Sequence, residues 1–127
     1  MYCFLNKQSM DKSILIVNND VSISSLIKMM LASSNTNFKI STSYDETIKS
    51  LKTNKYDLIV TDAVIKGSFV FQYLEDLKIM ASESPIVVMS EVDQDNIVSL
   101  ANKIGINEFI SFPFTKVDIE KRIGRYL

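Results

Sequence analysis

The residues of this sequence that could do chemistry each follow a short apolar run. They are Asn18, Asn19 and Asp20 after the first run, Asp62 after the third, Ser90 after the fourth, and Phe112 and Pro113 after the fifth. A carboxylate can hold a hard cation such as Mg²⁺, whereas an asparagine side chain offers only a neutral carbonyl oxygen. Asp20 and Asp62 are the two carboxylates among these residues.

Composition removes several classes of chemistry. The 127 residues include no histidine and a single cysteine, Cys3, so histidine catalysis, an internal disulfide and a zinc-ligand cluster are excluded. The formal net charge of −1 argues against a nucleic-acid-binding domain, which needs a clustered basic excess. No apolar run approaches the roughly 18 to 20 residues of a membrane span, and residues 1–10 lack the features of a secretory signal. We therefore expect a cytoplasmic protein with protein or small-molecule partners.

Short apolar runs alternate with amphipathic segments from Ser13 onward, which is typical of repeated βα units and a parallel sheet covered on both faces. The pattern predicts strands over residues 14–17, 38–43, 56–61, 86–89 and 109–111, and helices over residues 23–31, 44–52, 71–80, 97–104 and 115–127. In such open sheets, function lies beyond the carboxyl ends of the strands. Residues 1–11 are expected to form an extension, and residues 12–127 a single domain.

Local patterns add detail to this layout. Residues 14–17 are continuously apolar, as a strand buried on both faces requires, whereas residues 38–43 alternate and indicate a strand nearer an edge. The predicted apolar stripe of the first helix leaves Ser24 outside; it consists of Ile23, Leu26, Ile27, Met30 and Leu31. Gly105 stands where a helix terminator belongs.

Four motifs, ILIVNND, YDLIVTD, PIVVMSE and FISFPF, resemble in order and spacing those of the receiver domain of response regulators. The resemblance covers residues 12–127 and implies a doubly wound, flavodoxin-like (βα)₅ fold with a five-stranded parallel sheet of order 2-1-3-4-5. It further implies that Asp62 occupies the position that accepts a phosphoryl group from a histidine kinase while Mg²⁺ shields the charge. Ser90 matches the hydroxyl that bonds the acyl phosphate, and Phe109 matches the aromatic residue that reports the phosphorylated state.

The departures from the family pattern fall at the cationic parts of the site. Asn18 and Asn19 stand in place of two adjacent carboxylates that hold Mg²⁺, and Phe112 stands in place of the lysine that pairs with the phosphoryl oxygens. Phosphoryl transfer depends on neutralising the charge of the moving group. We therefore expect the Mg²⁺ site to be degenerate, and weak or empty, with Phe112 filling or covering the pocket. The residues at the positions of this Mg²⁺ site are Asn18, Asn19, Asp20 and Asp62.

Each of these residues also has a purely structural interpretation. Asp62 could simply bond neighbouring backbone N–H groups in its loop. Asn18 and Asn19 are common turn residues, with Asp20 or Ser22 as the N-cap of the following helix. Ser90 could cap the helix after it, and Phe109 could be an ordinary core aromatic.

Three functions remain open on the sequence. The first is a non-enzymatic pseudo-receiver without a cofactor, which binds protein partners such as a histidine kinase or an output protein, or forms a homodimer, through its fourth and fifth helices. The second is a phosphorylatable receiver that uses Asp62, Ser90 and a Mg²⁺ site completed by Asp20. The third is a flavodoxin-like cofactor binder, which is disfavoured because the loop after the first strand lacks a hydroxyl-rich phosphate cradle. Nucleic acid and membrane are not expected partners.

Overall fold

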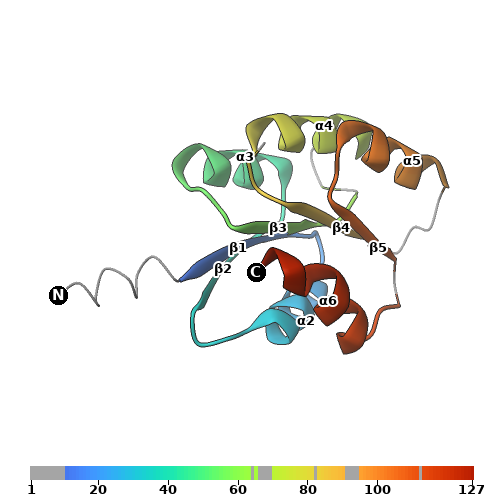
Figure 1. Ribbon diagram of the computed structural model, residues 1–127. Helices are drawn as coiled ribbons and strands as arrows, with labels where there is room; N and C mark the ends of the chain where they lie inside the picture. Colours follow the sequence, from blue (N-terminus) through green and yellow to red (C-terminus); the bar gives the residue numbers. More distant parts are fainter. Residues whose placement is uncertain (1–10, 64, 66–69, 82, 91–94, 112) are drawn as a thin grey trace.

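The computed structural model describes residues 11–63, 65, 70–81, 83–90, 95–111 and 113–127 and contains one five-stranded parallel sheet (Figure 1). The strands are β1 (Lys12–Val17), β2 (Thr36–Ser41), β3 (Leu58–Thr61), β4 (Ile86–Ser90) and β5 (Glu108–Ser111). Their order in the sheet is β2-β1-β3-β4-β5, and every neighbouring pair is parallel. The predicted doubly wound α/β fold and its strand order are confirmed. The predicted extension lies outside the described residues, apart from Asp11.

Helices cover both faces of the sheet, and they are α2 (Val21–Leu31), α3 (Tyr44–Thr53), α4 (Val70–Met80), α5 (Asp95–Ile104) and α6 (Lys116–Ile123), which runs into a 3₁₀ turn, η1 (Gly124–Tyr126). Figure 1 shows α3, α4 and α5 on one face, and α2 and α6 on the other. Alternate residues of β1 serve the two layers: Ile14 and Ile16 face the α2–α6 side, whereas Leu15 and Val17 face the α4–α5 side. The continuous apolar run of β1 follows from this double burial.

Several local predictions are confirmed. β2 lies at an edge of the sheet, as its alternating pattern predicted. Gly105 has a φ of 86° directly after α5, which a residue with a Cβ rarely adopts, so it terminates that helix. Asp20 is the N-cap of α2 and accepts the N–H of Ser22. In the part of the chain that the structure describes, no helix is long and apolar enough to cross a membrane.

Four predicted strand boundaries were wrong by two residues: β1 begins at Lys12 rather than residue 14, β2 lies two residues earlier than predicted at both ends, and β3 begins two residues later. β2 ends at Ser41, since the Ser43 side chain caps α3 by accepting the N–H of Glu46. β3 begins at Leu58, since Tyr56 instead contacts the Ser50 hydroxyl of α3. β2 is therefore shifted by two residues and β3 is shortened at its start, whereas the carboxyl ends of β1 and β3, before Asn18 and Asp62, are as predicted.

The predicted stripe of α2 was wrong at Ser24 and Leu26. Ser24 is fully buried, whereas the Leu26 side chain is 40% exposed, so the inner face of the helix is rotated toward Ser24 and Ile27. The Ser24 hydroxyl is the one buried side-chain polar atom without a hydrogen-bond partner among the described residues. An unsatisfied buried hydroxyl is unfavourable by about 1–3 kcal/mol.

We expect Ser24→Ala to raise the free energy of unfolding by about 1–2 kcal/mol, because it removes the unsatisfied hydroxyl. The matched control is Ser25→Ala, at an exposed neighbouring position of the same helix, which gains only helix propensity, roughly 0.5 kcal/mol. Urea denaturation of both variants measures the difference. Equal gains in the two variants would contradict a penalty at Ser24.

Candidate functional site

The loops after β1 and β3 meet at the carboxyl edge of the sheet. Val17 and Thr61 are partners in the β1–β3 register, so Asn18 and Asp62 follow paired residues. The backbone N–H of Asp62 also donates to the carbonyl oxygen of Val17 at 2.9 Å. The structure therefore brings together the two loops that the sequence analysis placed at the site.

Asn18 is a buried part of this edge and is used by the turn itself. Its side chain is 4% exposed, and its Oδ1 accepts the backbone N–H of Asp20 at 2.8 Å. Its own N–H donates to the carbonyl oxygen of Ser41 at 3.1 Å. The amide oxygen that could ligate a cation is thus already oriented toward the entrance of α2.

Asp20 is committed to the same helix entrance. Its Oδ1 accepts the N–H of Ser22 at 2.8 Å, and the residue is exposed, like Asn19 beside it. Losing such a cap is unfavourable by about 0.5–2 kcal/mol. Rotating Asp20 inward to complete a cation site would therefore sacrifice a stabilising contact of α2.

The Asp62 side chain is half-buried and bonds its own loop. Its Oδ1 accepts the backbone N–H of Ala63 at 2.7 Å, and the Thr61 hydroxyl donates to the Asp62 carbonyl oxygen at 2.9 Å. The contact with Ala63 is of the kind that the structural interpretation of Asp62 predicts.

These donors do not fit a Mg²⁺ ion of the kind that the resemblance implies. Such an ion needs an octahedral set of hard oxygens and is usually bound through carboxylates, but Asn18 and Asn19 contribute neutral amides. Among the described residues, no group of three or more acidic or cysteine side chains is close enough to hold a metal. Of the four predicted ligands, Asn18 and Asn19 are therefore not anionic, and the Asp20 carboxylate caps α2. Asp62 is thus the one predicted anionic ligand that does not cap a helix.

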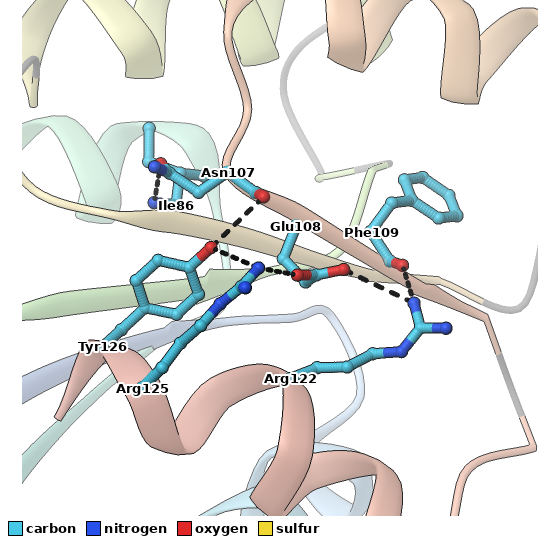
Figure 2. Close-up of polar contacts among 7 residues, drawn as sticks. All are labelled: Ile86, Asn107, Glu108, Phe109, Arg122, Arg125 and Tyr126. Atoms are coloured by element: carbon cyan, nitrogen blue, oxygen red, sulfur yellow. Dashed lines mark hydrogen bonds and ion pairs between the residues drawn. The ribbon is translucent and has the colours of Figure 1, made fainter.

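The other predicted site residues are only partly described. The backbone of Ser90 ends β4 opposite Ser111 of β5, but its side chain lies outside the described residues, as do Phe112 and residues 66–69 of the loop after Asp62. Phe109 is half-buried and packs against the cluster beneath α4 and α5. Figure 2 shows its ring on the side of β5 opposite to Arg122 and Arg125.

An ionic cluster joins α6 and η1 to β5, and sequence analysis did not predict its pairing. Glu108 accepts from Arg125 at 2.7 Å and from Arg122 at 3.4 Å (Figure 2). Arg122 also donates to the Phe109 carbonyl oxygen at 3.1 Å. The Tyr126 hydroxyl donates to the carbonyl oxygen of Asn107 at 3.3 Å. The arginines are more than half exposed, so solvent screening limits the stabilisation. The sequence showed only that the last helix carries mixed charge, and this pattern does not indicate which residue its arginines pair with.

A family model described as the response regulator receiver domain matches residues 14–124 of this chain. The chain belongs to this family. Five parallel strands in the order 2-1-3-4-5 and the carboxyl-edge position of Asp62 agree with that assignment. Receiver domains act in two-component signal transduction, and this chain is such a domain.

Curated relatives and solved structures support the assignment of the receiver domain. The chain is 27% identical over 121 residues to the alkaline phosphatase synthesis transcriptional regulatory protein PhoP of Bacillus subtilis, covering 93% of this chain and 49% of the relative. It is 30% identical over 118 residues to the transcriptional regulatory protein YvrH of the same organism, covering 91% of this chain and 48% of that relative. The chain thus spans about half the length of these relatives.

Among solved structures, a two-component response regulator from Clostridium difficile superposes on the receiver domain with a TM-score of 0.83 at 19% identity, covering 91% of this chain and 95% of the other. At that identity the likeness shows the fold and nothing finer. It leaves the chemistry of the site to the residues of this chain.

Proposed function

We propose that this receiver domain is a pseudo-receiver, a signalling module that contacts protein partners without phosphorylation of Asp62. The observation that carries the proposal is the buried Asn18 amide beside Asp62, which takes the place of an anionic cation ligand and bonds the turn instead. Asp20, the carboxylate that could compensate, caps α2. Without a cation or a lysine, charge on a transferred phosphoryl group would meet no opposite charge from these positions.

The partner surface that we propose is the side of the molecule formed by α5, β5 and α6. Arg122 and Arg125 are exposed on it and both pair with Glu108. With Lys116 and Lys121 they make four basic residues over α6 and η1, against three acidic ones, Glu108, Asp118 and Glu120, which leaves a small excess of positive charge. A histidine kinase or an output protein with an acidic face, or a second copy of this chain, are the candidate partners. Steering by such charge depends on ionic strength.

The alternative is a phosphorylatable receiver. It is favoured by the partial exposure of Asp62 at the carboxyl edge, because Asp62 matches the acceptor position of the family pattern. In this case Asp20 would have to leave its capping position and complete a cation site. The Ser90 hydroxyl would then bond the acyl phosphate.

Intact-mass spectrometry separates the two functions. We expect no adduct after incubation of the full chain with acetyl phosphate and Mg²⁺, because the site gathers too little positive charge. A receiver domain that retains both carboxylates and the lysine, treated in parallel, provides the positive control. An added mass of about 80 daltons, one phosphoryl group, that disappears in Asp62→Asn would refute the proposal and establish the alternative.

A further inference from the structure

Two hydroxyl groups in series end on the backbone of Asp62. The Tyr73 hydroxyl of α4 lies 2.8 Å from Thr61 Oγ1 at the end of β3, and Thr61 Oγ1 donates to the Asp62 carbonyl oxygen at 2.9 Å. A hydroxyl carries one hydrogen, so Tyr73 is the donor in its bond with Thr61. The two bonds therefore join α4 to the peptide group that follows Asp62.

Both ends of that peptide group are held. The Thr61 hydroxyl bonds its carbonyl oxygen, while its N–H, which belongs to Ala63, donates to Asp62 Oδ1 at 2.7 Å. A peptide group is planar and rigid, so the orientation of its carbonyl fixes the orientation of its N–H. The hydroxyl chain thereby sets the direction in which the Asp62 carboxylate is held.

The chain is buried, which makes opening it unfavourable. Tyr73 is 0% exposed and Thr61 is 1% exposed. Burial raises the pKa of the Tyr73 hydroxyl well above its usual value, and the nearby Asp62 charge acts in the same direction. Tyr73 thus remains a donor across the working pH range, and breaking the bond would leave buried hydroxyls unsatisfied.

Tyr73 is supported from outside by the contact between α3 and α4. The Tyr44 ring meets the Tyr73 ring edge-on, with the centroids 6.3 Å apart. The Tyr44 hydroxyl donates to Asp76 Oδ2 at 2.7 Å, and the exposed Gln72 side chain donates to Asp76 Oδ1 at 2.8 Å. A contiguous path therefore runs from the α3–α4 surface to the edge where Asp62 lies.

We propose that Thr61 and Tyr73 are positioning residues for the Asp62 carboxylate, and that Tyr44 couples this positioning to the α3–α4 contact. The proposal goes beyond the proposed function and does not depend on it, because a fixed carboxylate would serve a partner contact and a phosphoryl acceptor alike. A change at the α3–α4 surface would then alter the orientation of the Asp62 carboxylate, and a change at Asp62 would be felt at that surface. Such coupling requires a measured interaction between sites, not only a continuous path.

Nuclear magnetic resonance of the full chain tests the positioning. We expect Tyr73→Phe and Thr61→Val to speed hydrogen exchange of the Ala63 amide by about tenfold and to move the side-chain carboxyl resonance of Asp62. Thr61→Ser keeps the hydroxyl and should restore both signals. The matched control is Tyr56→Phe, which removes a tyrosine–serine hydroxyl pair at the opposite end of β3 and should change neither. If Thr61→Val does not fold, Tyr73→Phe alone decides the outcome.

The coupling is tested at a distance. Tyr44→Phe removes the contact with Asp76 but touches neither Thr61 nor Asp62, and it should speed Ala63 exchange by about two- to threefold. Combined with Tyr73→Phe, it should add nothing further. Unchanged Ala63 and Asp62 signals in Tyr73→Phe would overturn the positioning role, and fully additive effects of the two tyrosine variants would overturn the coupling. Neither readout involves phosphorylation, so the result is independent of the phosphodonor experiment.

Discussion

Replacing Asn18 and Asn19 with aspartate is expected to raise the affinity of the receiver domain for Mg²⁺ by at least about 100-fold. A carboxylate roughly 4 Å from a divalent ion contributes several kcal/mol at an effective dielectric constant of about 20. Part of that gain is offset, because Asn18 is buried and the new charge would lie next to Asp62. Without Mg²⁺ the variant should therefore be less stable than the natural chain, and added Mg²⁺ should raise its melting temperature.

Adding Phe112→Lys to this variant is expected to restore phosphorylation of Asp62 by a small phosphodonor, since the lysine supplies the remaining positive charge. Calorimetric titration with Mg²⁺ and intact-mass analysis measure the two steps. The matched control is Asn35→Asp with Asn37→Asp, two exposed positions at the start of β2 that add the same charge away from the site. If this control gains as much affinity for Mg²⁺, the effect is nonspecific and the electrostatic account is wrong.

Ile59→Ala is expected to lower the free energy of unfolding by about 3–5 kcal/mol, because it leaves a cavity in the central strand β3. Ile59 is fully buried in the cluster beneath α4 and α5. Total stability of a domain is about 5–15 kcal/mol, so the variant should be close to unfolding at physiological temperature.

Ile79→Ala is the control for this prediction, because it removes the same atoms from an isoleucine that is 76% exposed. Its free energy of unfolding should stay within about 0.5 kcal/mol of the natural value. Ile59→Val should fall between the two, at a loss of about 0.5–1.5 kcal/mol. Urea denaturation followed by circular dichroism measures all three. A similar loss at both isoleucines would mean that β3 does not bear the packing that the structure gives it.

The sequence predicted the strands and helices because their governing signal is local, whereas the strand order was implied by the resemblance to receiver domains. Residues 14–17 are apolar without interruption, and β1 is indeed buried on both faces, whereas the alternating residues 38–43 correspond to the edge strand β2. The carboxyl-edge positions of Asn18 and Asp62 follow from the ends of such runs. Ser24 was placed outside the stripe because polarity favoured exposure, although packing of α2 buries it.

The contacts between distant residues could not be predicted in the same way. Sequence analysis did not single out Tyr73, because its bond with Thr61 depends on how α4 lies over β3. The pairing of Glu108 with Arg125 likewise depends on where the chain returns to β5. The sequence offered Asp20 as one of two possible caps, and only the hydrogen bond to Ser22 identifies it as the one.

The turn after β1 bears on how the proposed pseudo-receiver would be regulated. Asn18 and Asp20 each accept a hydrogen bond from the backbone two residues ahead, so both side chains are held by the turn that leads into α2. If the chain is the pseudo-receiver that we propose, no phosphoryl group on Asp62 reports its state to its partners. The strength of its signal would then be set by gene expression and proteolysis, that is, by how many copies the cell maintains.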